Sequence, residues 1–207
     1  MPGRFITLEG GEGAGKTTAA DQITEWLEQR GRTVIRTREP GGTAAAEKVR
    51  QMLLDPETGD LEPMTELLLM FAARAENLSR VIRPALAAGK DVLCDRFTDA
   101  SRAYQGGGRQ LGMQVVDRLA AVVHPDLTPD LTLLMDVPVE LGMARVRGRG
   151  AKVDRFEQSK TDFLERARSA YLARARMEPA RIVVIDASGP LEQVRASVSR
   201  ALEARLK

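Results

Sequence analysis

A glycine-rich stretch near the N-terminus carries the most specific chemical signal in the sequence. Residues 10–17, GGEGAGKT, match the pattern G-x-x-x-x-G-K-[ST] at every fixed position. Glycines let backbone N–H groups wrap around phosphates, because they place no side chain in the way and tolerate positive φ angles. Lys16 is placed to reach terminal phosphates, and the Thr17 hydroxyl is placed to ligate Mg²⁺. This phosphate loop predicts binding of a nucleoside triphosphate.

The phosphate loop does not decide what happens to the terminal phosphate, because hydrolytic switches, motors and small-molecule kinases all share it. The N-K-x-D element with which a GTP switch would usually read its base is absent from the sequence. A kinase instead needs a cationic acceptor site and a lid that excludes water, since transfer to water competes with the useful reaction.

Three cationic segments at or after the ends of predicted strands fit an acceptor site. They are residues 38–42 (REPGG), 95–97 (DRF) and the loop 103–109 (AYQGGGR). Because the carboxyl ends of parallel strands meet at one edge of a sheet, Arg38 and Arg96 are expected to converge on an anionic acceptor. Asp95 is expected to hold Mg²⁺, directly or through water, opposite Thr17. Any one of these arginines alone would be read as an ordinary surface cation.

A basic segment further along the chain fits a lid. Residues 145–157 (RVRGRGAKVDRFE) carry five cations within eleven positions, interrupted by glycines, between two predicted helices. Closing over the phosphates, such a flap would present Arg149 or Arg155 to the charge that develops on the transferred group. In other phosphoryl-transfer enzymes such a cation contributes about 10³ to 10⁵ in rate. A solvated basic loop is the equal alternative for this segment taken by itself.

Short β-type runs that alternate with helical patterns would position these segments. Buried strands are predicted at residues 4–9, 33–37, 91–95, 131–137 and 181–186. Helices are predicted at residues 17–30, 44–54, 64–87 with a bend or break before Pro84, 111–123, 139–146, 159–178 and 190–206. Strands separated by helices imply an α/β fold with a parallel sheet covered on both faces. No repeat or linker divides the chain, so residues 1–207 are expected to form a single domain.

Composition excludes several classes of protein. Of the residues, 43% are hydrophobic and 29% charged, a balance that excludes disorder and a coiled coil along the whole length. A net charge of +2 argues against a polymeric nucleic-acid partner, which needs a strong basic excess. The single cysteine, Cys94, and the lack of an apolar run of about 20 residues favour a cytoplasmic protein with no membrane partner.

Arginine is strongly preferred over lysine, at 25 residues against 6. Its guanidinium fork suits small anionic ligands, although compositional drift is the alternative. Most of the arginines outside the segments above are expected on solvated helix faces; examples are Arg166, Arg168, Arg174 and Arg176. His124 and Cys94 are expected to be structural.

As an ordered set, these motifs resemble the bacterial type of thymidylate (dTMP) kinase. The set comprises residues 5–10 (FITLEG), 37–43 (TREPGGT), 95–97 (DRF), 103–108 (AYQGGG), 129–132 (PDLT) and 154–157 (DRFE), and it covers nearly the whole chain. The resemblance implies the three-layer P-loop kinase fold of nucleoside monophosphate kinases. In that fold a five-stranded parallel sheet has helices on both faces and a small lid, here at about residues 147–157. It also implies a homodimer that transfers the γ-phosphoryl group of Mg-ATP to dTMP, giving dTDP for dTTP synthesis.

The resemblance also implies how dTMP is held. Phe71 would stack on thymine, and Arg74 would hydrogen-bond its O4 edge. Ser101 would contact the base near N3. Tyr104 would lie under the sugar and leave no room for a 2′-hydroxyl, with Gln105 beside it.

The remaining roles implied by the resemblance concern the phosphates. Glu12 would accept a hydrogen bond from the 3′-hydroxyl, while Arg38 and Arg96 would hold the dTMP phosphate. ATP would be bound by Gly10, Gly11, Glu12, Gly13, Ala14, Gly15, Lys16, Thr17, Thr18 and Arg147, the last flanking adenine. The implied catalytic cations are Lys16, Arg96, Arg149 and Arg155, and the implied Mg²⁺ ligands are Thr17 and Asp95.

A difference between branches of the family, a departure from its pattern and two alternatives stay open at this point. Another branch of the family carries an arginine where this chain has Gly13, so the missing cation is expected from the lid. Phe97 replaces the Tyr or His often found after Asp-Arg. The acceptor is alternatively dUMP, another nucleotide or a small metabolite, since a methyl-sized difference gives limited selectivity. A switch or regulatory ATPase with no acceptor is the second alternative.

Overall fold

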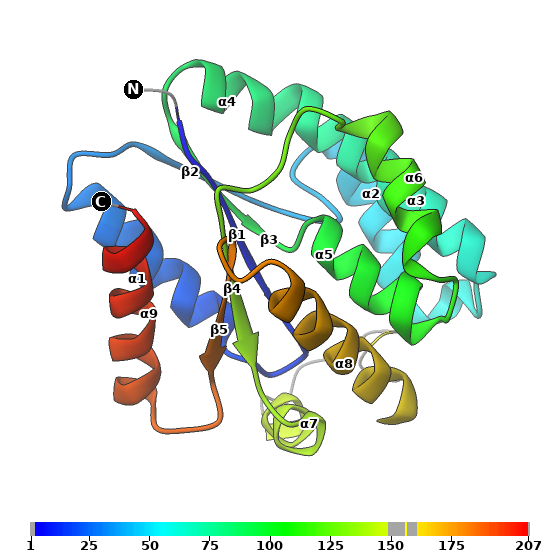
Figure 1. The fold of residues 1–207 in the computed structure, drawn as a ribbon. Coiled ribbons are helices and arrows are strands. Elements are labelled where there is room, and N and C mark those ends of the chain that lie inside the picture. The colour runs from blue at the N-terminus through cyan, green and yellow to red at the C-terminus, as the bar shows by residue number, and fades with distance from the viewer. Residues whose placement is uncertain (1–2, 149–155, 157–160, 207) are drawn as a thin grey trace.

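The fold is built on a parallel sheet of five strands. The structure is a computed structural model that describes residues 3–148, 156 and 161–206 (Figure 1). The strands are β1 (Phe5–Gly10), β2 (Val34–Arg38), β3 (Asp91–Asp95), β4 (Leu131–Asp136) and β5 (Ile182–Asp186). They pair in the order β2-β3-β1-β4-β5. Each lies within one residue of the predicted strand, because a sheet covered on both faces selects near-continuous apolar runs; all six residues of β1 are buried.

Helices cover both faces of the sheet and complete three layers. They are α1 (Lys16–Glu28), α2 (Ala44–Leu54), α3 (Pro63–Asn77), α4 (Arg83–Ala87), α5 (Thr98–Ser101), α6 (Met113–Val123), α7 (Val139–Gly148), α8 (Thr161–Met177) and α9 (Leu191–Arg205). Helices α1 and α9 lie on one side of the sheet, and α2, α3, α5, α6 and α8 lie on the other (Figure 1). Within the described ranges, no helix has the length and apolar character to cross a membrane.

The long predicted helix at residues 64–87 is interrupted, as expected from its proline. Helix α3 passes into a π-helical segment, Leu78–Ile82, and α4 starts at Arg83. Pro84 has no N–H to donate, so it is tolerated in the first turn of α4 and not in the middle of a helix. The chain therefore stays helical from Pro63 to Ala87, with the π-helical segment between α3 and α4.

The predicted loop at residues 103–109 is wrong, because the chain there is helical. Helix α5 continues into a π-helical segment, Arg102–Gly108. A Cβ on Gly107 would lie 2.7 Å from the Ala170 Cβ, and one on Gly108 would lie 2.6 Å from the Phe163 Cε2. The glycines therefore allow α8 to approach closely, and they do not make a turn. The local sequence cannot distinguish these two uses of glycine.

His124 is buried and fully hydrogen-bonded, which supports its structural interpretation. Its Nδ1 lies 3.1 Å from the Leu127 carbonyl oxygen, and its Nε2 lies 2.8 Å from the Thr98 hydroxyl. Because a carbonyl can only accept, Nδ1 carries the proton and Nε2 accepts from Thr98. Burial, with the nearby Arg74 charge, lowers the pKa of His124 to about 4.

This depressed pKa predicts acid sensitivity. The unfolded chain takes up a proton below pH 6.5 that the folded chain resists until about pH 4, so the free energy of unfolding is expected to fall across that window. The His124 contribution amounts to about 3 kcal/mol. Urea unfolding of the wild type and of His124→Gln at pH 7, 6, 5 and 4 separates the contribution of His124 to the pH dependence from that of the carboxylates. Equal pH dependence in the two proteins would contradict the prediction.

Candidate active site

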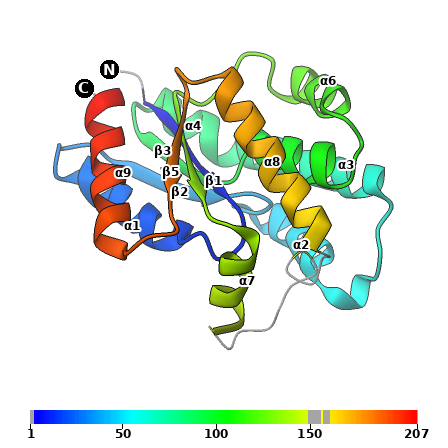
Figure 2. The ribbon, with the colours of Figure 1, turned by 60° about the horizontal axis from the view of Figure 1, so that its bottom comes forward.

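A cavity of about 430 Å³ opens at the carboxyl edge of the sheet. Figure 2 shows β1 turning into α1 at this edge, beside α7. The cavity gathers most of the residues predicted from the sequence, namely Glu12, Gly13, Ala14, Gly15, Lys16, Thr17, Thr18, Arg74, Asp95, Arg96, Ser101, Tyr104 and Gln105. Gly10 and Gly11 form the base of the loop just behind it. The described lining residues come from four segments, 12–18, 39–54, 70–74 and 95–105, together with Arg145 and Phe156.

The phosphate loop has the backbone conformation that its glycines predict. Gly10, Gly13 and Gly15 have φ angles of 137°, 68° and 80°, and α1 begins immediately afterwards at Lys16. The free N–H groups at the start of α1 favour an anion there. The Lys16 ammonium donates to the carbonyl oxygens of Gly10 (3.3 Å) and Gly11 (3.4 Å). Burial, together with the charge of Arg96, lowers the pKa of Lys16.

Gly13 packs against the backbone of α7, which explains why no cation can occupy this position. A Cβ on Gly13 would lie 2.1 Å from the Gly142 carbonyl oxygen, and one on Gly142 would lie 2.3 Å from the Glu12 carbonyl oxygen. Two glycines thus let the phosphate loop and α7 touch main chain to main chain. The cations expected to compensate, Arg149 and Arg155, lie outside the described residues, as does most of the predicted lid.

Glu12, Tyr104 and Arg96 form one hydrogen-bonded cluster at the centre of the cavity. The Tyr104 hydroxyl (2.7 Å) and Arg96 Nη2 (3.2 Å) both donate to Glu12 Oε1. Arg96 Nη1 also donates to the Gly10 carbonyl oxygen at 2.8 Å. Arg96 has a φ of 70°, a left-handed conformation that costs a residue with a side chain about 1–2 kcal/mol. Such strain is typical of functional positions held by their surroundings.

Arg74 is a buried cation with three different environments around its guanidinium. Its Nε donates to Glu39 Oε2 (2.7 Å) and its Nη2 donates to the Ser101 hydroxyl (3.0 Å). Its Nη1 is buried with no hydrogen-bond partner among the described residues. Burial raises the pKa of Glu39, while the adjacent Arg74 charge acts to lower it. The free N–H groups of Nη1 are therefore available to a ligand acceptor.

Phe71 does not lie where stacking on a base in this cavity would require. Its side chain is buried, stacks on His124 with ring centroids 6.5 Å apart, and lies under the Arg74 guanidinium at 4.4 Å. Met70, one position earlier, lines the cavity instead. Consecutive helical residues point about 100° apart, so a shift of one position exchanges a core residue for a cavity residue. The sequence signal at Phe71 is that of core packing in a Leu-rich run.

Arg38 also lies apart from the main cavity. It is 53% exposed, pairs with Glu47 at 3.0 Å, and lines a neighbouring cavity of about 420 Å³ that shares Thr17 and Asp95. Arg50 of α2, which the sequence did not single out, lines the main cavity and donates to the Pro40 carbonyl oxygen at 3.0 Å. Burial lowers the pKa of Arg50, and the charge of Arg38 adds to this. A lone arginine in a helix gives no local signal of such a position.

The side chains of Gln105 and Arg109 are anchored away from the phosphate loop. Gln105 Nε2 donates to Glu66 Oε1 (2.9 Å), and Arg109 pairs with Glu66 Oε2 (3.0 Å). Arg109 is therefore not a third acceptor cation, although Gln105 still contributes to the cavity wall.

Two arginines of α7 differ in their contacts. Arg147, predicted to flank adenine, is exposed in the last turn. Arg145 lines the cavity, and its Nη1 donates to the Ala187 (2.8 Å) and Gly13 (3.4 Å) carbonyl oxygens. Its Nη2 donates to the Ser188 carbonyl oxygen at 3.2 Å. Arg145 thus links the phosphate loop to the segment between β5 and α9.

Thr17 and Asp95 provide oxygen atoms where the two cavities meet. Asp95 Oδ1 is buried and lacks a hydrogen-bond partner within the described part of the chain. In that part no cluster of three or more His, Cys, Asp or Glu side chains is arranged for a metal. Two protein oxygen ligands are enough for Mg²⁺, because this ion keeps several bound waters and takes further ligands from substrate phosphates.

Comparison with known proteins gives consistent similarities along the chain. The family model described as thymidylate kinase matches residues 8–198. The chain is 55% identical over 206 residues to the thymidylate kinase of Chromohalobacter salexigens, covering 99% of this chain and 97% of that protein. It is 54% identical over 198 residues to the thymidylate kinase of Pseudomonas putida, covering 96% and 95%. The crystal structure of thymidylate kinase from Ehrlichia chaffeensis is similar with a TM-score of 0.80 and 32% identity, covering 98% and 99%.

Proposed function

The chain belongs to the thymidylate kinase family, and we propose that it transfers the γ-phosphoryl group of ATP to dTMP, giving ADP and dTDP. The observation that carries this proposal is the single cavity that joins a complete phosphate loop to a pocket lined by Arg74, Ser101 and Tyr104. A donor nucleotide on the loop and an acceptor nucleotide in the pocket would share this one cavity.

Recognition of thymine is assigned to the pocket around Arg74. The Nη1 of Arg74, which has no partner among the residues that the structure describes, suits the O4 carbonyl. The Ser101 hydroxyl, already 3.0 Å from Arg74 Nη2, suits the edge near N3. Met70 supplies an apolar surface in the same wall, the position for which Phe71 was expected. A thioether side chain adapts its shape to a flat ring at little cost.

The sugar and the acceptor phosphate are assigned to the central cluster. Glu12 accepts from Tyr104 and Arg96, and its carboxylate has further lone pairs for the 3′-hydroxyl of the sugar. Arg96 and Arg50 border the same cavity and would bind the dTMP phosphate. Arg38 lines the neighbouring cavity, beyond Thr17 and Asp95, so it is placed less directly for the dTMP phosphate than predicted.

The donor side is assigned to the phosphate loop. Its N–H groups, the start of α1 and Lys16 would hold the phosphates of ATP. Thr17 and Asp95 would hold Mg²⁺, which would supply positive charge to neutralise the phosphates. The roles of Arg147 at adenine and of Arg149 and Arg155 in a lid stay predictions, since the latter two lie outside the described residues. A cytoplasmic location likewise stays a prediction, supported by the single buried thiol of Cys94.

The chemistry needs positioning and charge, and it needs no general base. The acceptor is a phosphate monoester, which is already mostly ionised near pH 7 because its second pKa is about 6. Lys16 and Arg96 line the same cavity and would neutralise the charge that builds up as the two phosphates approach in line. Holding both nucleotides in one geometry supplies much of the rate.

ADP formation is expected to depend on dTMP. In a coupled assay with ATP, dTMP should be the best acceptor, and dUMP should be about 10- to 200-fold poorer because it lacks one methyl group. AMP, GMP and a reaction without acceptor serve as controls. ADP release that is independent of dTMP would favour a regulatory ATPase, and a preference for AMP or GMP would overturn the assignment of the acceptor.

A homodimer is proposed from an apolar surface on α2, α3 and α6. These helices lie on one side of the sheet (Figure 1), and they carry the exposed large apolar side chains Met52, Met64, Leu68, Met113 and Val122. Several exposed apolar side chains on neighbouring helices are typical of an interaction site, and a second copy of the chain is the occupant expected for the family.

Introducing a charge into this surface is expected to dissociate the dimer. Leu68→Glu would have to bury a carboxylate in an apolar interface, which is costly without a partner. Sedimentation velocity should report a monomer for Leu68→Glu and a dimer for the wild type. Leu191→Glu is the matched control, because Leu191 is similarly exposed on α9, on the other side of the sheet. A wild-type monomer would contradict the proposal.

A further inference from the structure

Glu9 is a fully buried carboxylate in β1, directly before the phosphate loop, and it does not line the main cavity. Its Oε1 accepts from the Phe97 backbone N–H (2.7 Å), and its Oε2 accepts from the Tyr171 hydroxyl (2.7 Å). Burying a carboxylate carries a large desolvation cost unless it is paired or hydrogen-bonded. The two short hydrogen bonds therefore indicate what this group is placed to hold.

Both partners of Glu9 lead to Arg96. The Phe97 N–H belongs to the peptide unit that follows Arg96, the residue with a φ of 70°. The Tyr171 hydroxyl accepts from Arg96 Nη1 at 3.5 Å while it donates to Glu9. Glu9 is thus connected to Arg96 at its backbone through one contact and at its guanidinium through the other.

The residues on either side of Glu9 hold Arg96 as well. The Leu8 carbonyl oxygen accepts from the Arg96 backbone N–H at 3.0 Å, and the Gly10 carbonyl oxygen accepts from Arg96 Nη1 at 2.8 Å. Three consecutive residues of β1 therefore form one scaffold for Arg96. Of the three, Glu9 alone acts through its side chain, so its contribution can be removed by substitution.

We propose that Glu9 is a positioning residue that holds Arg96 in its left-handed backbone conformation and aims its guanidinium at the acceptor phosphate. This inference rests on the proposed function, in which Arg96 binds that phosphate. Glu9 itself touches no substrate and exchanges no proton with one. Its effect on turnover passes through Phe97 and Tyr171.

The contacts of Glu9 suit the ionised carboxylate, because both partners are donors. A protonated Glu9 would need an acceptor, so the Tyr171 hydroxyl would have to reverse. The hydroxyl proton would then face the Arg96 guanidinium, which offers no acceptor. Protonation of Glu9 therefore loosens the hold on Arg96.

Burial and the charges around Glu9 place this protonation slightly above neutral pH. Burial, and next the charge of Asp99, raise the pKa of Glu9 to about 8, opposed by Tyr171, Arg96 and the Phe97 N–H. Lys16 on α1 and Cys94 on β3 also interact electrostatically with it. The proton goes to Glu9 and not to Asp99, because Asp99 has its own cations.

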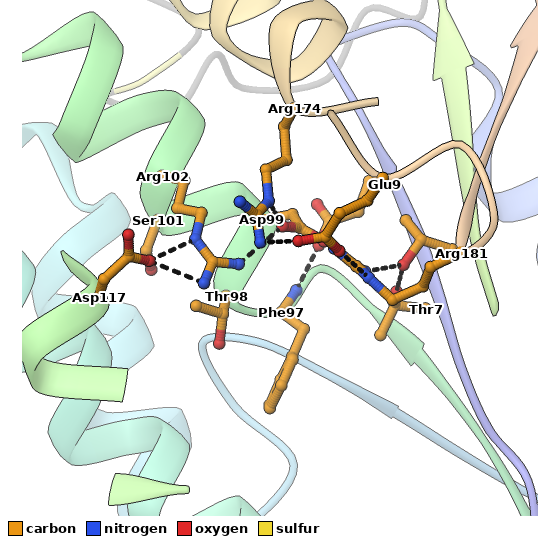
Figure 3. Close-up of polar contacts among 12 residues, drawn as sticks. Thr7, Glu9, Phe97, Thr98, Asp99, Ser101, Arg102, Asp117, Arg174 and Arg181 are labelled. Carbon is orange, nitrogen blue, oxygen red and sulfur yellow. Dashed lines mark hydrogen bonds and ion pairs between the residues drawn. The ribbon is translucent and has the colours of Figure 1, made fainter. Parts of the chain in front are cut away.

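Figure 3 shows those cations, Arg102, Arg174 and Arg181, converging on Asp99 beside Glu9. Arg102 and Arg181 donate to Asp99 at 2.9 and 2.8 Å, and Arg174 lies 3.6 Å away. Although burial acts to raise it, hydrogen bonds from Arg181 and Arg102 hold the pKa of Asp99 below its usual value.

A double-mutant cycle between Glu9 and Arg96 tests the proposal. At a pH above 8, where Glu9 is ionised, Glu9→Gln is expected to lower kcat about 10- to 100-fold, the range typical of residues that orient a functional group. In an Arg96→Lys background the same change should cost little, because the group that Glu9 holds is already gone. An equal loss in both backgrounds would overturn the proposal. ADP formation by the wild type with dTMP tests the proposed function separately, before any variant is compared.

A pH profile adds a measurement that a purely structural role would not move. The kcat of the wild type should rise with pH through about 8 as Glu9 ionises, and this limb should be missing in Glu9→Gln. Tyr171→Phe, which removes only the hydroxyl, should lower kcat in the same direction and serves if Glu9→Gln does not fold. A limb that persists unchanged in Glu9→Gln would overturn the assignment.

Thr7→Val is the matched control. Thr7 is a buried residue of the same strand, and its hydroxyl bonds to Thr132 Oγ1 at 2.7 Å without contacting Arg96. This substitution should lower the free energy of unfolding measured in urea and leave kcat unchanged. A loss of kcat in Thr7→Val equal to that in Glu9→Gln would show that any buried polar change in β1 has this effect, and would overturn the proposal.

Discussion

Replacing Arg96 with alanine is expected to lower kcat for ADP formation about 10³-fold while the fold is retained. Arg96 lines the cavity between the phosphate loop and the acceptor pocket, where it pairs with Glu12 at 3.2 Å. Removing it would leave the charge of two approaching phosphates less compensated. A coupled assay at saturating ATP and dTMP measures the change, and near-normal turnover would contradict the role assigned to Arg96.

The controls for this prediction separate charge from backbone strain. Arg83→Ala removes an arginine that pairs with Asp126 on the surface of α4, and it should leave kcat unchanged. Arg96→Ala retains the strained φ of 70°, whereas Arg96→Gly relieves it. Arg96→Gly should therefore be more stable than Arg96→Ala by about 1 kcal/mol in urea and equally inactive.

Replacing Arg74 with alanine is expected to lower the free energy of unfolding by about 3–5 kcal/mol, because it leaves the buried Glu39 carboxylate without its partner. The Arg74 charge also acts to lower the pKa of Glu39, which burial raises. Without Arg74 the folded-state pKa of Glu39 rises further. The free-energy cost of burying the ionised Glu39 is therefore absent below its unfolded-state pKa of 4.5, and it grows as the pH rises above that value. Urea unfolding should thus show a larger deficit at pH 8 than at pH 5.

A paired substitution distinguishes stability from substrate recognition at this site. Arg74→Met combined with Glu39→Gln removes both charges, so it should recover much of the stability lost by Arg74→Ala. It should not recover affinity for dTMP, because the N–H groups assigned to thymine O4 are gone. If the KM for dTMP stays at the wild-type value in this variant, thymine is not read by Arg74.

The arginines of α8 show how sequence reasoning misjudges long side chains. Solvated positions were predicted for four of them; Arg166 and Arg176 are exposed, whereas Arg168 and Arg174 are partly buried, and three of the four tie α8 to the rest of the fold. Arg166 donates to the Gly108 carbonyl oxygen, Arg168 binds Asp136 through two hydrogen bonds, and Arg174 pairs with Asp99 and Glu178. The long side chain of an arginine on a helix can extend into solvent or reach a distant carboxylate. Only the packing of the helix decides which of the two positions the side chain takes.

Residue types and spacing determined the elements and the phosphate loop, because both depend on local chemistry. The five strands lie within one residue of their predicted ranges, and the loop adopts the positive φ angles that its glycines allow. The ordered motifs also determined the family, since a chance match of the whole set along one chain is remote.

Only the tertiary structure decided which side chains share the cavity. Met70 lines the cavity in place of Phe71, and Arg50 lines it as well. Arg38 lies in the neighbouring cavity, and the predicted loop at residues 103–109 is a helix packed against α8. The tertiary structure also placed Glu9 under Arg96, 87 positions away along the chain. A shift of one residue on a helix rotates a side chain by about 100°, and a contact between distant segments exists only after the layers have packed.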